Sequence, residues 1–413
     1  MAFFTSSKNT FLLWFLVMTS CGNSPKANEN IRNSVVTEKE SLDAPAIVVG
    51  ANQTSAYLPL LKNKKVGLVA NQTSVIFKDN DQHVHLVDSL LALQIDLIKV
   101  FAPEHGFRGA VDAGEKVTDG KDAKTGLPLI SLYGANRKPT HAQLEDLDVV
   151  VFDIQDVGVR FYTFIATLQL VMEACAKNNI PVIVLDRPNP NAHYIDGPMM
   201  EKEHAGFLGM TPIPLVYGMT IGEYAQMVNG EGWLTGAKKA ALTVIPLLHY
   251  SHTSEYTIPI RPSPNLPNDT AINLYPSLGL FEGTNVNAGR GTNFQFQRYG
   301  APFMDATQYD FSYTPTPQFG AQNPKHKEVL CYGRDLSNTP KMNKVDLQWL
   351  IDAYNNTASK DQFFLTEGFT KHAGTATLQQ QIINGLSAEE IRETWQKDIA
   401  DFKAIRARYL IYD

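Results

Sequence analysis

The sequence predicts an α/β protein, in which a doubly wound and mostly parallel sheet is followed by a smaller C-terminal α+β domain. From Ala46 onward, short apolar runs alternate with helical patterns. These runs are continuously apolar, which is typical of parallel strands covered by helices on both faces. After about residue 260 the pattern changes, and proline-, glycine- and asparagine-rich loops precede a group of helices. A chain of 413 residues has room for two such domains.

Each element of the first domain follows from a local pattern. Short apolar runs predict strands at residues 47–50, 65–70, 95–101, 128–132, 148–152 and 181–186. Helices are predicted between them at residues 83–93 and 161–178. In the second helix, apolar residues recur with the 3.6-residue period of an amphipathic helix. We place this domain at residues 45–265.

The second domain is predicted at residues 266–413, beyond the proline-dense connector 261–267. Proline interrupts helices and central strands, so such a connector indicates a boundary. Helices are predicted at residues 344–355, 377–384 and 387–406. The last begins with Ser387 and Glu390 in the spacing of a capping box.

The N-terminus has the pattern of an export signal. Lys8 precedes an apolar run at residues 11–18, and no acidic residue occurs before Glu29, as in secretory signal peptides. The run is too short to span a bilayer, which takes about 20 helical residues. An N-terminal core helix and a simple cleaved signal are the alternatives.

The end of this run resembles a bacterial lipobox, in the letters MTSC of residues 18–21. This resemblance implies that residues 1–20 are a lipoprotein signal peptide and that Cys21 is lipidated. Residues 21–44 are polar and lack periodicity, so we expect a tether. The protein is then expected in the cell envelope, anchored in a membrane on the periplasmic or outer side.

Composition and the absence of known motifs exclude several classes of protein. The net charge is −6 and no basic block occurs, which argues against a nucleic-acid partner. No glycine-rich dinucleotide fingerprint, phosphate loop or nucleophile elbow is present, so no cofactor is expected. The cysteines show no zinc spacing, and no metal is expected. Cys175 falls on an apolar helical face and is expected to be a buried thiol; its pairing with Cys331 in a disulfide stays open.

Polar side chains follow several of the predicted strands. In parallel sheets, ligands bind outside the carboxyl ends of the strands. Each such residue alone is compatible with a loop cap or a solvated charge, but several carboxylates on one rim predict a site. The residues concerned are Asn71, Glu104, His105, Asp153, Gln155, Asp156, Asp186 and Arg187.

The second domain opens with another polar group, in which Glu282, Asn285 and Arg290 lie in glycine- and asparagine-rich loops. These residues suit a cleft between the domains. A turn with an exposed ion pair is the alternative.

Five motifs in chain order resemble those of the NamZ-type exo-β-N-acetylmuramidases. They are residues 101–108 (FAPEHGFR), 152–163 (FDIQDVGVRFYT), 185–190 (LDRPNP), 262–267 (PSPNLP), and 281–284 (FEGT) with 289–292 (GRGT). The resemblance extends from about residue 47 to the C-terminus. It implies a Rossmann-like N-terminal domain, a smaller C-terminal domain and an active cleft between them. It also implies release of N-acetylmuramic acid from the non-reducing end of peptidoglycan chains, with Glu104 as the catalytic residue.

The residues fit this implied reaction. Glycoside hydrolysis usually uses two carboxyl groups, one protonated and one ionised. We pair Glu104 with Glu282, and keep Asp153 and Asp156 as substitutes for the second group. The lactyl carboxylate of N-acetylmuramic acid suits a bidentate arginine. The candidates for this contact are Arg160, Arg187 and Arg290, while Tyr162 and Tyr275 are candidates for stacking on a sugar.

Two other functions stay open at this point. One is a non-catalytic peptidoglycan-binding envelope lipoprotein, whose carboxylates only bind sugar hydroxyls. The other is a hydrolase or lyase that acts on another anionic envelope glycan.

Overall fold

The computed structural model describes residues 45–413, except residues 81, 105, 109–118 and 237–238. The predicted signal peptide, Cys21 and the tether lie outside the described residues, and so does His105. In the part of the chain that the structure describes, no helix has both the length and the hydropathy that crossing a bilayer requires.

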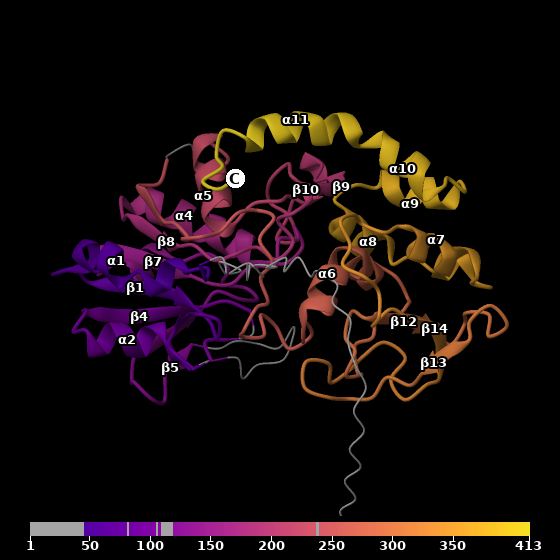
Figure 1. Cartoon of the computed structure of the whole chain (residues 1–413), viewed down its shortest axis with the longest axis horizontal. Helices are drawn as coiled ribbons and strands as arrows, with labels where there is room; N and C mark the ends of the chain where they lie inside the picture. The colour runs from indigo at the N-terminus through magenta and orange to yellow at the C-terminus, as the bar shows by residue number, and fades with distance from the viewer. Residues whose placement is uncertain (1–44, 81, 105, 109–118, 237–238) are drawn as a thin grey trace, which may run out of the picture. The chain divides into compact units, whose positions relative to one another are not determined.

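Among the described residues, a seven-stranded sheet forms the centre of the N-terminal domain, in the order β11-β8-β7-β1-β4-β6-β5 (Figure 1). Its strands are β1 (Val66–Ala70), β4 (Leu97–Ala102), β5 (Gly120–Lys121), β6 (Pro128–Ser131), β7 (Val149–Asp153), β8 (Val182–Leu185) and β11 (Leu242–Ile245). Neighbouring strands are parallel, apart from the antiparallel pair β5 and β6. Without β5 this is the strand order of doubly wound dinucleotide-binding folds, which reverses direction between β1 and β7. The predicted fold class is confirmed.

Both faces of the sheet are buried, which explains the continuous apolar runs. Val69 and Phe152 belong to the core on one face, whereas Leu68 and Val151 belong to the core on the other. The first core continues into the C-terminal domain, and the second packs against α1 and α2. The helices of this domain are α1 (Thr54–Leu61), α2 (Leu86–Ala92), α3 (His141–Leu144), α4 (Phe164–Asn178) and α5 (Ile221–Gly230).

Two predicted elements of the N-terminal domain differ in the structure. Residues 47–50 are not a strand, because Val48 forms only an isolated bridge with Leu248 and a 3₁₀ helix (Gly50–Asn52) follows. The predicted helix 83–93 begins three residues late. Its first residues form β3 (His83–His85), which pairs antiparallel with β2 (Val75–Phe77), and His85 caps α2 by accepting a hydrogen bond from the Val87 amide.

The C-terminal domain combines a small antiparallel sheet with helices. Its sheet has the order β12-β14-β13. The elements are α6 (Asp269–Leu278), a 3₁₀ helix (Gly279–Gly283), β12 (Arg298–Ala301), β13 (Phe311–Tyr313), β14 (Cys331–Asp335), α7 (Gln348–Asn355), a 3₁₀ helix (Lys360–Gln362), α8 (Thr366–Ala373), α9 (Thr377–Ile383), α10 (Ala388–Thr394) and α11 (Gln396–Arg406). The predicted helix 387–406 is therefore two helices, divided at the buried Trp395. Cys175 and Cys331 are buried free thiols, so no disulfide joins them.

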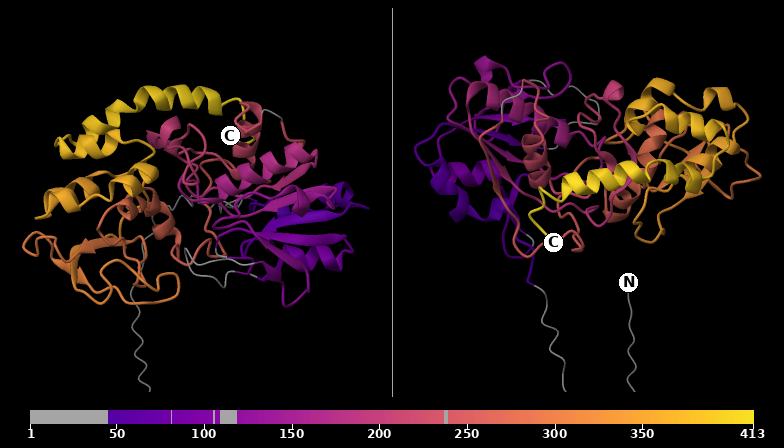
Figure 2. Two further views of the ribbon diagram at one scale, coloured as in Figure 1. Left: turned by 180° about the vertical axis from the view of Figure 1, so that it is seen from behind. Right: turned by 90° about the horizontal axis from the view of Figure 1, so that it is seen from above.

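A hairpin and the C-terminal helix connect the two domains. The hairpin consists of β9 (Asp196–Met199) and β10 (Pro214–Val216), separated by a 3₁₀ helix (Lys202–His204). Helix α11 runs from the C-terminal domain back to the N-terminal domain (Figure 2), where Arg406 Nε donates to the Gly218 carbonyl at 2.9 Å. The chain ends there, with the Tyr412 hydroxyl donating to Asp186 Oδ2 at 2.7 Å.

Candidate active site

A cavity of about 160 Å³ is lined by residues of both domains. The N-terminal domain contributes Glu104 and the segment that leads into α4, and the C-terminal domain contributes a second carboxylate, Glu282. The lining residues are Glu104, Phe161, Tyr162, Thr163, Phe164, Leu208, Ser263, Asn265, Leu266, Tyr275, Glu282, Arg290, Phe296 and His372. Two carboxyl groups on one cavity are what glycoside hydrolysis requires.

Glu104 lies just beyond the carboxyl end of β4. A turn holds it there, closed by the Gly106 amide on the Pro103 carbonyl at 3.1 Å. Gly106 has φ 75°, a conformation that favours glycine. The Thr163 hydroxyl donates to Glu104 Oε2 at 3.2 Å. The carboxyl group is thus half-buried, with the Thr163 hydroxyl from the segment before α4 and the Tyr133 hydroxyl both against it.

Glu282 is surrounded by cationic groups. Arg290 Nη1 donates to Glu282 Oε2 at 3.0 Å, and Lys325 Nζ donates to the Glu282 backbone carbonyl at 3.1 Å. Burial favours the neutral carboxyl, but the charges of Arg290 and Lys325 outweigh this effect and lower the pKa of Glu282 below its ordinary value. Glu282 is therefore an ionised carboxylate at neutral pH.

Aromatic rings form the wall between these two groups and the core. Tyr275 makes edge-to-face contacts with Phe161 and Phe296, at centroid distances of 5.1 and 4.7 Å. Burial raises the pKa of the Tyr275 hydroxyl, and Glu282 and Glu104 raise it further. Tyr275 is therefore within electrostatic range of both carboxyl groups. The Tyr162 hydroxyl is engaged, because it donates to the Pro262 carbonyl at 2.8 Å.

His372 is a cavity residue that the sequence analysis missed. Its Nδ1 lies 2.8 Å from the Gly368 carbonyl, so Nδ1 carries the proton in that contact. Burial lowers the pKa of His372, and the imidazole is neutral. No local motif marks this residue, since it lies in α8, about 90 residues beyond Glu282 in the sequence.

Several predicted site residues form buried hydrogen bonds or ion pairs with other parts of the protein and do not line the cavity. Arg187 forms a buried bidentate ion pair with Asp153, at 2.6 and 2.8 Å. Asn71 Oδ1 accepts from the Thr73 amide at 2.9 Å. Gln155 Nε2 donates to the Pro188 carbonyl at 2.6 Å. These side chains stabilise the loops at the strand ends instead of lining the cavity.

Asp156 and Asp186 are likewise enclosed. The carboxylate of Asp156 accepts from the Tyr217 hydroxyl and from the Gly158 amide. Asp186 accepts from the Thr220 hydroxyl at 2.7 Å and from Tyr412. Burial raises the pKa of each to about 6, although these hydrogen bonds oppose the shift.

Arg160 and Asn285 also lie away from the cavity lining. Arg160 is fully buried and donates to the carbonyls of Pro198 at 2.7 Å and Ala373 at 2.6 Å. The Asn285 side chain donates to the Gln362 carbonyl. Of the three arginines predicted to bind a lactyl carboxylate, only Arg290 lines the cavity.

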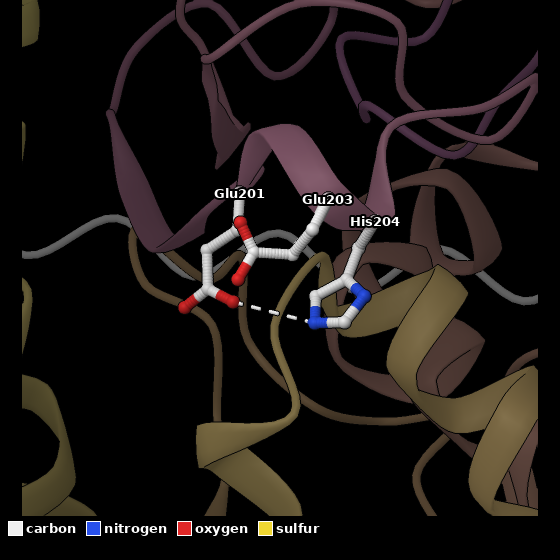
Figure 3. A group of neighbouring side chains, drawn as sticks. All are labelled: Glu201, Glu203 and His204. Atoms are coloured by element: carbon white, nitrogen blue, oxygen red, sulfur yellow. Dashed lines mark ion pairs between the residues drawn. The ribbon is translucent and has the colours of Figure 1, made fainter.

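One group of side chains in the described residues has the geometry to hold a metal ion. The ligand atoms of Glu201, Glu203 and His204 lie within 4.8 Å of one another (Figure 3). Glu201 Oε2 and His204 Nε2 are already 3.4 Å apart as an ion pair, and Glu203 is exposed. Exposed acidic groups of this kind are common without a metal, and we assign none here.

Comparisons with known proteins match most of the chain. Residues 66–270 match the family model of the exo-β-N-acetylmuramidase NamZ N-terminal domain, and residues 273–412 match that of its C-terminal domain. The peptidoglycan β-N-acetylmuramidase NamZ of Bacillus subtilis is 36% identical, with 98% of each chain covered.

Two solved structures from Bacteroides fragilis, both DUF1343 family proteins, are similar in fold. One is 43% identical with a TM-score of 0.81, and covers 89% of this chain and 99% of its own. The other is 29% identical with a TM-score of 0.76, and covers 89% of this chain and 100% of its own.

Proposed function

The chain belongs to the exo-β-N-acetylmuramidase NamZ family, and from this premise we propose how it releases N-acetylmuramic acid from the non-reducing end of peptidoglycan fragments. It is a glycoside hydrolase. The observation that supports the proposal most directly is that Glu104 and Glu282, which come from different domains, line the same cavity.

The two carboxyl groups have different surroundings, which suggests their roles. Glycosidic cleavage needs one acid that protonates the leaving oxygen and one ionised carboxylate that acts at the anomeric centre. Glu282 takes the second role, because Arg290 and Lys325 favour its ionised form. Glu104 takes the first role, as the carboxyl group whose neighbours are the neutral hydroxyls of Thr163 and Tyr133.

Arg290 remains the candidate for contact with the lactyl carboxylate. It lines the cavity beside Glu282, and its Nη2 donates to the Gly320 carbonyl at 3.2 Å. A guanidinium has five N–H donors, so these two contacts leave donors for a substrate carboxylate.

The test is the product released from a disaccharide with N-acetylmuramic acid at its non-reducing end. Hydrolysis liberates free N-acetylmuramic acid, whose anomeric carbon becomes a new reducing end, and the second sugar regains the free hydroxyl that had carried the glycosidic bond. A binding protein liberates nothing, and an esterase or amidase leaves the glycosidic bond intact. Either of those two results contradicts the proposal.

We further propose that the mature protein is exported and held in the cell envelope through a lipid on Cys21. The lipobox-like residues 18–21 and the short apolar run before them support this proposal.

A further inference from the structure

A second cavity, of about 520 Å³, adjoins the first at Glu104. Glu104, Thr163 and Leu208 line both cavities, whereas Glu282 and Arg290 line only the first. The general acid is thus shared by two adjoining spaces, and the ionised carboxylate belongs to one of them.

This arrangement indicates which part of the substrate the second cavity holds. A general acid protonates the oxygen between the sugar that is released and the rest of the chain, so it contacts both sides of the bond. The ionised carboxylate acts on the released sugar, which places that sugar beside Glu282. The second cavity then lies on the side of the leaving part of the glycan.

A prearranged guanidinium lies on the wall of this second cavity. Arg137, in the loop after β6, stacks on Phe207, with Cζ 4.3 Å from the ring centroid. Phe207 lies at the tip of a tight turn that two reciprocal backbone hydrogen bonds of 2.9 Å close between Gly206 and Gly209. The aromatic platform is therefore fixed, and it limits the conformational freedom that Arg137 loses on binding.

Arg137 differs from the other basic side chains of this cavity in having no acidic partner among the described residues. Lys371 Nζ is 2.6 Å from Glu367, and His204 Nε2 is 3.4 Å from Glu201. Within the described part of the chain, no side chain or carbonyl accepts a hydrogen bond from Arg137, which lines a cavity that the substrate enters. A stacked, planar guanidinium binds carboxylates in a bidentate manner.

We propose that the second cavity binds the leaving part of the glycan and that Arg137 binds a carboxylate on it. This inference rests on the proposed function and extends it to the substrate class: glycans whose leaving part is anionic are preferred. The carboxylate comes either from a lactyl group or from a stem peptide on the next muramic acid residue.

The test compares three substrates that share the same terminal N-acetylmuramic acid. The leaving part is neutral in the disaccharide, carries one lactyl carboxylate in the unsubstituted tetrasaccharide, and carries a peptide in the peptide-bearing tetrasaccharide. Arg137→Gln should lower kcat/KM for an acid-bearing substrate about 10-fold more than for the disaccharide, mainly through KM. A lower kcat/KM for the unsubstituted tetrasaccharide identifies the lactyl group as the source of the carboxylate. A lower kcat/KM for the peptide-bearing tetrasaccharide alone identifies the stem peptide as the source.

Two further variants serve as controls. Arg137→Lys keeps the positive charge and should recover part of the preference, in kcat/KM, for acid-bearing substrates over the disaccharide. Arg408→Gln removes an arginine that also lies against a ring, at 5.6 Å from Tyr409, but lines neither cavity, and it should leave the ratio between substrates unchanged. Equal losses on all three substrates in a folded Arg137→Gln protein would overturn the inference.

A binding measurement separates this inference from the proposed function. In a Glu104→Gln background, calorimetry reports affinity for the same three saccharides without turnover. A parent protein that hydrolyses none of them contradicts the proposed function, while the effect of Arg137→Gln on affinity still decides the inference. Unchanged affinity for both tetrasaccharides overturns it.

Discussion

The ion pair between Arg290 and Glu282 sets the charge state of the cavity. Arg290 is the first of the groups that lower the pKa of Glu282 against the effect of burial. Arg290→Gln removes the main positive charge that opposes the effect of burial, so the pKa of Glu282 should rise. The ionised fraction then falls at a higher pH, so the acidic limb of the kcat/KM–pH profile should move to higher pH. Arg408→Gln, which removes an ion pair with Glu231 outside the cavity lining, is the control. An acidic limb that does not move in Arg290→Gln would contradict the assignment of Glu282 as the ionised carboxylate.

Asp156 provides a pH test of stability. Burial raises its pKa to about 6 in the folded protein, above the unfolded value of about 3.9. Its contribution to stability is full below pH 3.9 and is lost as the pH rises through 6. Asp156→Asn does not titrate, so its stability relative to the parent should improve between pH 4 and 7, by up to about 3 kcal/mol. Urea unfolding of both proteins at pH 4 and pH 7 measures the change. A difference in unfolding free energy that is the same at both pH values would contradict the prediction.

The rule that ligands bind beyond the carboxyl ends of parallel strands located Glu104, but it also selected polar residues that do not line the cavity. It cannot tell a side chain that points outward from one that folds back, as Asp153 does toward Arg187. The same rule applied to the loop after β6 would have found Arg137. His372 has no such signal, because only the packing of α8 brings it to the cavity.

At the scale of elements, Arg160 joins the hairpin of β9 and β10 to the end of α8. Its guanidinium donates to Pro198 and Ile213 on one side, and to the terminal carbonyls of α8 at His372 and Ala373 on the other. These carbonyls have no partner within the helix and lie at the negative end of its dipole. Arg160 therefore caps α8 and positions His372.

Replacing Arg160 should affect stability more than substrate choice. Arg160→Met leaves several buried carbonyls without a donor and should cost about 3 kcal/mol or more in unfolding free energy. The exposed Arg408→Met should stay within about 0.5 kcal/mol. Urea unfolding measures both. A stable Arg160→Met protein that selectively lost substrates with a lactyl group would instead support the role predicted from the sequence.

Strands could be predicted more reliably than helices. Burial on both faces leaves a continuous apolar run, and β1, β4, β6, β7 and β8 all follow such runs. Helices α1 and α6 contain Pro59 and Pro276, which interrupt the helical pattern that the sequence analysis relied on. The chain divides into α10 and α11 at Trp395, whose indole is buried, and the periodicity of the sequence does not mark this division.

At the scale of the whole molecule, the proposed lipid anchor should be independent of the candidate site. Cys21→Ser should abolish incorporation of labelled fatty acid and move the protein from the membrane to the soluble fraction, because each buried CH₂ contributes about 0.8 kcal/mol to membrane binding. Turnover of a soluble disaccharide should be unaffected. Ser20→Ala is a neighbouring control, and equal labelling of Cys21→Ser and parent would contradict the lipid anchor.

The central claim is that residues of two domains form one hydrolytic site, and the most direct measurement is turnover and thermal melting of Glu104→Gln on the same preparation. Glutamine keeps the size and the hydrogen bond from Thr163 but removes the ionisable group. We predict an unchanged melting temperature and a loss of N-acetylmuramic acid release of about 10²–10⁴-fold or more. Near-normal release from a well-folded Glu104→Gln protein would contradict the account.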